Sequence, residues 1–101
     1  MSGQLQHIVL LKVRADADPA AVDAAFAAAR ALPGQVDGVL DVVAGPDVSV
    51  EGLTAGHTHG VLVRFADAAA RERYFPHPAH LALGEQMSKL IEGATVVDLA
   101  G

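Results

Sequence analysis

The sequence predicts an α+β domain of the ferredoxin-like class, a split β-α-β arrangement with the element order β-α-β-β-α-β. Two observations lead to this prediction. Short runs rich in Val, Ile and Leu alternate with longer Ala-rich segments of helical periodicity, and two such segments divide four apolar runs into the pattern of this fold. A chain of 101 residues has room for one core, so we expect residues 1–101 to form a single domain.

The first half of the chain contains the first strand and the first helix. Residues 7–13 (HIVLLKV) are apolar at successive positions, which is typical of a strand covered on both faces. Asp18 is a good N-cap and Pro19 fits the first turn of a helix. We therefore predict a helix over residues 20–32, with Phe26 on its apolar face and Pro33-Gly34 as its end.

The middle of the chain predicts two further strands. Residues 39–44 (VLDVVA) and 58–65 (THGVLVRF) are β-rich apolar runs. The polar, glycine-containing residues 47–56 between them are predicted to form the longest loop.

The last third predicts a broken helix and a final strand. Asp67 is positioned to cap a short helix over residues 68–74, which Pro76 interrupts. A further helix is predicted from Pro78 to about residue 91, where Gly93 would stop it before a strand over residues 94–99.

The predicted helices can cover only one of the two faces of the predicted sheet. Helices on one face of a four-stranded antiparallel sheet leave the other face open, yet residues 7–13 and 39–44 offer apolar side chains to both faces. A second copy of the chain is the simplest cover for that surface, and we expect a homodimer.

Composition excludes several classes of function. The net charge of −5, with no basic stripe, argues against a nucleic-acid partner. No apolar run approaches the roughly 20 residues that span a bilayer, so we expect no membrane partner. Without cysteine there is no disulfide and no thiolate chemistry. The N-terminal residues lack the features of a signal peptide, and we expect a cytoplasmic location.

Five histidines, at positions 7, 57, 59, 77 and 80, are the main candidates for chemistry. Four of these histidines have a structural interpretation. His77 could cap the helix that begins at Pro78, and His80 could hydrogen-bond the backbone at the start of that helix. His7 could be a strand residue whose ring is hydrogen-bonded within the protein, and His57 could be a solvated loop residue. Under these interpretations the histidines shape the fold and carry no chemistry.

Two functional interpretations compete with the structural ones. The pairs His57/His59 and His77/His80 could hold a metal, but no acidic residue lies beside either pair to orient the imidazoles, so we expect no metal. Alternatively, the positive end of the helix dipole keeps His80 neutral, which suits a general base in a metal-free pocket.

Several motifs resemble one known family. HIVLLKV at residue 7, ALPGQVDGVL at residue 31, GPDVSVEGLTAGHTHG at residue 45 and YFPHPAHLALG at residue 74 are similar to the stress-responsive dimeric α/β-barrel (Dabb) family, which includes a plant polyketide cyclase. The resemblance covers the chain from about His7 to Leu99. It implies a ferredoxin-like protomer whose sheet pairs with that of a twin to form a dimeric α/β barrel.

The resemblance also implies a site. In the cyclase-like members a cavity lies between the sheet and the helices, with no cofactor. Its polar end would be formed by His7, His59, Tyr74 and His80, with His80 as base and Tyr74 as its hydrogen-bonding partner, and its apolar wall would include Phe26 and Val61. His77 would be structural. Ala27, Ala28 and Ala29 stand where the cyclase has bulkier residues, and His57 replaces an aromatic, so the plant substrate does not carry over.

These observations leave three functions open. The first is the binding of a small apolar ligand in the cavity of a stress-responsive protein. The second is a metal-free cyclase or lyase reaction on a polyketide-like carbonyl compound, with His80 as general base. The third is a cofactor-independent or haem-degrading monooxygenase, which the absence of Trp and the pattern of the histidines disfavour.

Overall fold

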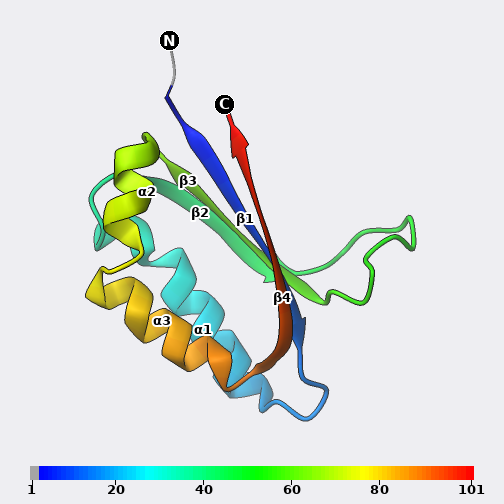
Figure 1. The fold of residues 1–101 in the computed structure, drawn as a ribbon. Coiled ribbons are helices and arrows are strands. Elements are labelled where there is room, and N and C mark those ends of the chain that lie inside the picture. Colours follow the sequence, from blue (N-terminus) through cyan, green and yellow to red (C-terminus); the bar gives the residue numbers. More distant parts are fainter. Residues whose placement is uncertain (1–2) are drawn as a thin grey trace.

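The computed structural model describes residues 3–101, and these form one antiparallel sheet with its helices on one face (Figure 1). The strands lie in the order β2-β3-β1-β4. In chain order the elements are β1 (Leu5–Val13), α1 (Pro19–Arg30), the 3₁₀ turn η1 (Leu32–Gly34), β2 (Val39–Pro46), β3 (His59–Phe65), α2 (Ala68–Tyr74), α3 (Pro78–Ser88) and β4 (Ile91–Ala100). The predicted α+β, ferredoxin-like fold class is confirmed.

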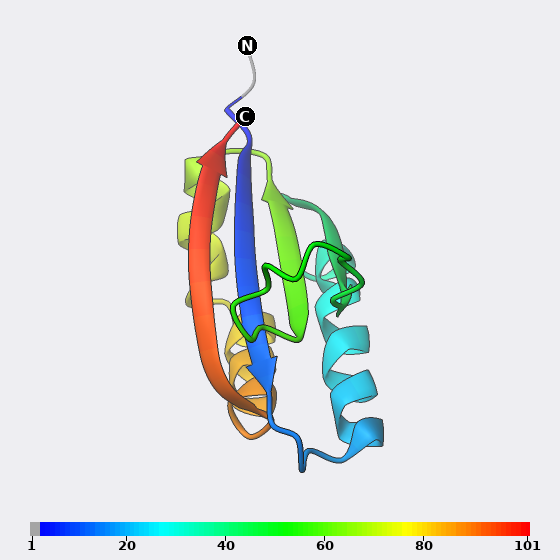
Figure 2. The same cartoon turned by 90° about the vertical axis from the view of Figure 1, so that its right-hand side faces the viewer.

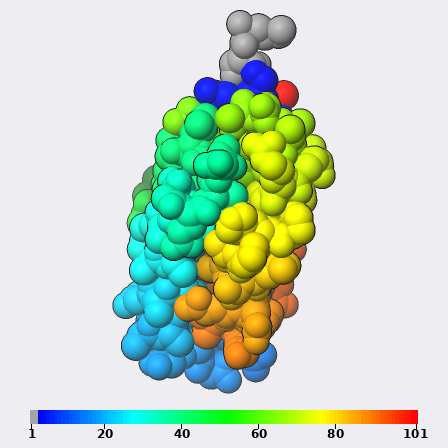
Figure 3. Space-filling model, turned by 90° about the vertical axis from the view of Figure 1, so that its left-hand side faces the viewer, coloured from blue at the N-terminus to red at the C-terminus, as the bar shows by residue number. Residues whose placement is uncertain are grey.

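The strand β1 lies in the middle of the sheet and divides its side chains between the two faces. His7, Val9 and Leu11 point to the helices, and Ile8 and Leu10 point away from them, as the side-chain alternation of a strand requires. The helices and the sheet enclose the core, whose fully buried members include Leu32, Val63 and Phe65. Seen from the helix side, α1, α2 and α3 cover the sheet (Figure 3).

The helix α1 begins as predicted but ends earlier. The carboxylate of Asp18 accepts a hydrogen bond from Ala20 N at 3.3 Å, which confirms it as the N-cap. The helix ends at Arg30 instead of Leu32, and residues 32–34 form a separate 3₁₀ turn. Pro33 explains the difference, because it has no N–H and its ring would clash with the carbonyl four residues earlier.

The second helical segment is broken at the predicted place. Asp67 caps α2 by accepting a 2.8 Å hydrogen bond from Ala70 N. The helix ends at Tyr74, and His77 caps α3 through a 3.0 Å hydrogen bond from Ala79 N to its Nδ1 atom. The prediction of His77 as the helix cap is therefore confirmed.

The end of α3 was predicted wrongly. The helix stops at Ser88, and the strand β4 already begins at Ile91, so that Gly93 lies within the strand and does not stop the helix. The sheet decides this boundary: Ile91 pairs with Val13, and Leu90 O accepts a 2.8 Å hydrogen bond from Arg14 N. Tertiary pairing overrides the helical periodicity of residues 89–91.

The loop between β2 and β3 is an ordered arm, Asp47 to Thr58, and is longer than the predicted 47–56. A 2.8 Å hydrogen bond from Asp47 N to Thr58 O closes its base. The arm projects from the side of the sheet that has no helices (Figures 1 and 2). Val48, Val50 and Leu53 on the arm are exposed by 80% or more.

No helix within residues 3–101 is long and apolar enough to cross a lipid bilayer.

The cap of α3 supplies a first test. His77→Ala removes the acceptor of Ala79 N and should lower the free energy of unfolding by about 1 kcal/mol, as the loss of a helix cap does. His77→Asn keeps an acceptor at the same place and should restore most of the loss. Urea denaturation of the three proteins measures the difference. Equal stability of the alanine variant and the wild type would contradict the role of His77 as a cap.

Candidate functional site

A cavity of about 220 Å³ lies between the sheet and the helices α2 and α3. One part of its lining is polar and consists of His7 from β1, Tyr74 from the end of α2 and His80 from the start of α3. The remaining wall is mostly apolar and includes Val9, Leu11, Val61, Val63, Leu83 and Met87. The cavity thus combines a small polar cluster with an apolar body, the usual composition of a small-molecule site.

The break between α2 and α3 places Tyr74 and His80 together. Their ring centroids lie 4.3 Å apart at an angle of 45°. In a continuous helix, Phe75 O would accept a hydrogen bond from Ala79 N, but that N–H bonds the His77 ring instead. Phe75 O accepts from the Nδ1 atom of His80, at 2.9 Å.

This hydrogen bond fixes the tautomer of His80. A carbonyl oxygen can only accept, so Nδ1 must carry the hydrogen. In the neutral ring the lone pair is then on Nε2. His80 therefore presents a proton acceptor on the side of its ring that faces away from the backbone.

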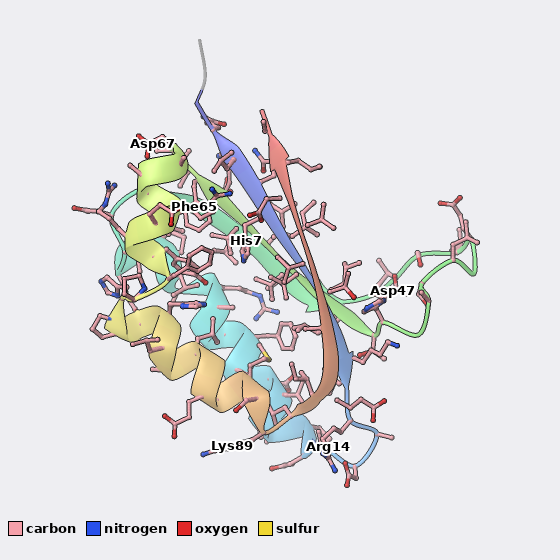
Figure 4. The ribbon with its side chains drawn as sticks, in the orientation of Figure 1. His7, Arg14, Asp47, Phe65, Asp67 and Lys89 are labelled. Atoms are coloured by element: carbon pink, nitrogen blue, oxygen red, sulfur yellow. The ribbon has the colours of Figure 1, made fainter. Side chains whose placement is uncertain are left out.

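His7 is held in a similar way by a charged group. It is 7% exposed, and its Nδ1 lies 2.6 Å from Oδ1 of Asp98 on the neighbouring strand β4. The other carboxylate oxygen of Asp98 accepts a 3.0 Å bond from Arg71 of α2. Because a carboxylate accepts, Nδ1 of His7 donates. Figure 4 shows His7 and Phe65 between the sheet and the helices.

Three polar atoms at this end of the cavity have no protein partner. Within residues 3–101 no atom hydrogen-bonds Nε2 of His7, Nε2 of His80 or the hydroxyl of Tyr74. Every fully buried side-chain nitrogen or oxygen in that range does have a hydrogen-bond partner. Each of the three atoms must therefore reach accessible space. All three residues line the same cavity, so the cavity offers a ligand two imidazole acceptors and one phenol.

Burial determines the state of the phenol. Tyr74 is 3% exposed, and desolvation raises its pKa to about 12. The hydroxyl, neutral at physiological pH even with its ordinary pKa of 10.0, is held more firmly in that form. A neutral phenol can donate a hydrogen bond to an oxygen on which negative charge develops.

The structure brings together some of the predicted site residues and separates others. His7, Tyr74, His80 and Val61 line the cavity. His59 lies further along the sheet, opposite Leu11, with its ring 5.0 Å from that of Phe26, and neither His59 nor Phe26 is in the lining. The Nδ1 atom of His59 lies 2.7 Å from the hydroxyl of Thr58.

The arrangement of the remaining histidines bears on the metal alternative. His57 is not a solvated loop residue: its ring is hydrogen-bonded to Thr54 O at 2.8 Å and to the Thr95 hydroxyl at 3.0 Å, which ties the arm to β4. His57 lies outside β3, so it does not form a pair on one strand face with His59. Within residues 3–101 no three His, Cys, Asp or Glu side chains gather as a metal site would need.

Sequence reasoning missed Asp98 and Arg71. The only signal in the sequence was an acidic residue in the apolar run TVVDL. Its partner is 91 positions away and is set by the pairing of β4 with β1, where Asp98 lies opposite His7. Nothing local to either residue specifies that register.

The fold and the cavity together define a ferredoxin-like domain with a small-molecule site between sheet and helices. Residues 5–100 match the model of one family, described as the Stress responsive A/B Barrel Domain (Dabb). The chain belongs to this family, as its motifs predicted.

Individual relatives agree with this assignment. The chain is 27% identical over 94 residues to olivetolic acid cyclase from Cannabis sativa, covering 93% of each protein. It is similar to a dimeric ferredoxin-like protein of unknown function from Jannaschia sp. CCS1, with 27% identity, a TM-score of 0.87 and coverage of 98% and 100%. Hydroxynitrile lyase from Passiflora edulis shares the fold, with a TM-score of 0.90, 19% identity and coverage of 100% and 95%.

The shifted phenol of Tyr74 can be measured directly, because it is the only tyrosine in a chain without tryptophan. We expect its ultraviolet phenolate absorbance to appear with a pKa of about 12 instead of 10.0. The unfolded chain ionises near 10, so the contribution of the neutral phenol to stability is complete below that pH and is lost as the pH rises towards 12. Titration of the folded protein with an ordinary pKa near 10 would contradict the burial of this hydroxyl.

Proposed function

We propose that this protein binds a small, largely apolar compound with a carbonyl or hydroxyl group in the cavity between the sheet and the helices. The observation that carries the proposal is the cluster of three unpartnered polar atoms, from His7, Tyr74 and His80, at one end of an apolar cavity. A ligand hydroxyl that donates to an imidazole nitrogen, or a carbonyl oxygen that accepts from the Tyr74 hydroxyl, would satisfy groups that the protein leaves open.

The size of the cavity limits the ligand. An apolar cavity of about 150 Å³ accepts benzene. The cavity here has about 220 Å³, so it fits a single substituted ring or a chain of similar size. A polycyclic cofactor of the size of haem is too large for this space.

The same cluster supports catalysis as a second candidate function. With Nδ1 of His80 bonded to Phe75 O, its Nε2 is free to remove a proton from a carbon next to a carbonyl. The electron pair of that C–H bond would move into the carbonyl, and the neutral hydroxyl of Tyr74 would stabilise the resulting oxyanion. Attack of the enolate carbon on a second carbonyl then forms the new C–C bond of a cyclisation. The π electrons of that carbonyl move onto its oxygen, and the alkoxide takes the proton back from Nε2 of His80. The relative named as a cyclase supports this alternative.

His7 has a different role in this proposal. Asp98 fixes its orientation and can stabilise a positive charge on the ring, so His7 can hold the carbonyl oxygen when it is protonated at Nε2. The pair would thus orient the carbonyl towards Tyr74 while His80 acts on the neighbouring carbon.

We also propose that two chains form a homodimer through the sheet face opposite the helices. That face leaves Val43, Val97 and Leu99 exposed by 69%, 47% and 51%. The register places Val43 on this face, while Val42 points to the helices with Val63. The arm lies on the same side, and a hollow of about 700 Å³ separates it from β2 and β3. Solved relatives of the same fold described as dimeric support the proposal.

Ligand binding can be tested with alkyl-substituted dihydroxybenzoic acids, the class of olivetolic acid, by titration calorimetry. We expect saturable binding to the wild type. His80→Ala should bind about tenfold more weakly, a loss of roughly 1.4 kcal/mol, because one hydrogen bond in the cavity is removed. Tyr74→Phe should show a smaller loss.

His57→Ala is the matched control, since it removes a histidine that lies on the arm, outside the cavity lining, and it should bind as the wild type does. No saturable binding to the wild type, or unchanged binding to folded His80→Ala, would overturn the proposed site.

Association can be tested by sedimentation equilibrium at micromolar concentration. Val97→Asp should convert dimers into monomers, because it would bury an unpaired charge between the two sheets. Leu81→Asp is the control: Leu81 is exposed by 57%, similar to Val97, but it lies on α3 in the helix layer. A wild type that sediments as a monomer, or equal effects of the two variants, would contradict this interface.

A further inference from the structure

Gly84 occupies the middle of α3, where glycine is the least suitable residue apart from proline. In a helix interior, glycine is less stabilising than alanine, because its backbone loses more freedom on folding. A glycine at such a position therefore needs a reason in the surrounding structure.

Packing does not supply the reason. At Gly38 the need for glycine is plain: its φ is +89°, and an added Cβ would lie 2.4 Å from Cβ of Ala70. At Gly84 an added Cβ would meet nothing within 4 Å, and the backbone is ordinary helix. The space beside Gly84 is empty.

That empty space belongs to the mouth of the cavity. Gly84 lines the cavity and is also exposed at the surface, and the same is true of Ser88 one turn later and of Ala94 on β4. Three small residues thus surround an opening between α3 and the edge strand β4. The same two elements also expose large apolar side chains, Leu81 on α3 by 57% and Val96 on β4 by 56%.

We propose that this opening is the route by which ligands reach the cavity, and that Gly84 sets its width and so the size of the molecules admitted. The ligand part of the inference rests on the proposed function. The opening itself can be tested without any ligand, because the chain has one tyrosine and no tryptophan, so Tyr74 alone provides the intrinsic fluorescence. Tyr74 is 3% exposed and lines the cavity.

Acrylamide is a suitable probe, since it is small, neutral and must approach the phenol ring to quench it. Gly84→Leu should reduce the bimolecular quenching constant of Tyr74 several-fold, because the added side chain narrows the mouth. Ser88→Leu should have the same effect from one turn away. Gly84→Ala should raise the melting temperature and reduce quenching only slightly.

Glu85→Leu is the matched control. It adds a leucine to the neighbouring position of α3, but Glu85 lines the groove towards α1 instead of the cavity. Quenching of this variant should equal that of the wild type. Unchanged quenching in folded Gly84→Leu, or the same reduction in Glu85→Leu, would overturn the proposed route.

A ligand series distinguishes this inference from the proposed function. With dihydroxybenzoic acids of increasing alkyl length, Gly84→Leu should slow the association of the larger members and leave the association rate of the smallest unchanged. Failure of the wild type to bind any member would contradict the proposed function. The quenching of Tyr74 needs no ligand, so it would still show whether the opening is the route to the cavity. Equal association rates of wild type and Gly84→Leu for every member would show that Gly84 does not select by size.

Discussion

The interruption of the second helical segment at Phe75-Pro76-His77 is the feature on which the site depends. Two prolines remove two N–H groups, and the ring of His77 takes a third, from Ala79, as the cap of α3. The carbonyl of Phe75 is therefore left for the ring of His80, which fixes the His80 tautomer and directs Nε2 to the cavity side. The same break brings the rings of Tyr74 and His80 together, with their centroids 4.3 Å apart and their planes at 45°. The structural and chemical interpretations of YFPHPAH are thus two consequences of one backbone arrangement.

The central strand β1 divides the protein into two functional sides. Its alternating side chains place His7, Val9 and Leu11 among the helices, where the cavity lies, and Ile8 and Leu10 on the open face, where we propose the partner. Because neighbouring residues of one strand serve the two sides, a partner can stabilise the sheet without entering the cavity. The mouth between α3 and β4 lies on the helix side and stays clear of the proposed interface.

A carboxylate shared by two side chains lies beside the polar end of the cavity. His7 and Arg71 share the carboxylate of Asp98, which joins β1, β4 and α2 at the polar end of the cavity. Since the carboxylate of Asp98 pairs with Arg71, the guanidinium stays outside the cavity lining. What the cavity offers a ligand is then limited to two ring nitrogens and a neutral phenol. Such a set suits the binding and deprotonation of a carbonyl compound better than the binding of a highly charged one.

The sequence by itself determined the order of elements, the caps Asp18, Asp67 and His77, the helix break and the family, because these depend on neighbours within a few residues. It also predicted the membership of His7, Tyr74, His80 and Val61 in one cavity, through the family resemblance. Only the tertiary structure decided the end of α3, where pairing of Ile91 with Val13 replaced helical bonds. It also decided the Asp98–His7 contact, the separation of His59 from the cavity and the open mouth at Gly84. These features depend on the register of the strands and on the distance between α3 and β4. Both are set by contacts between residues that lie far apart in the sequence.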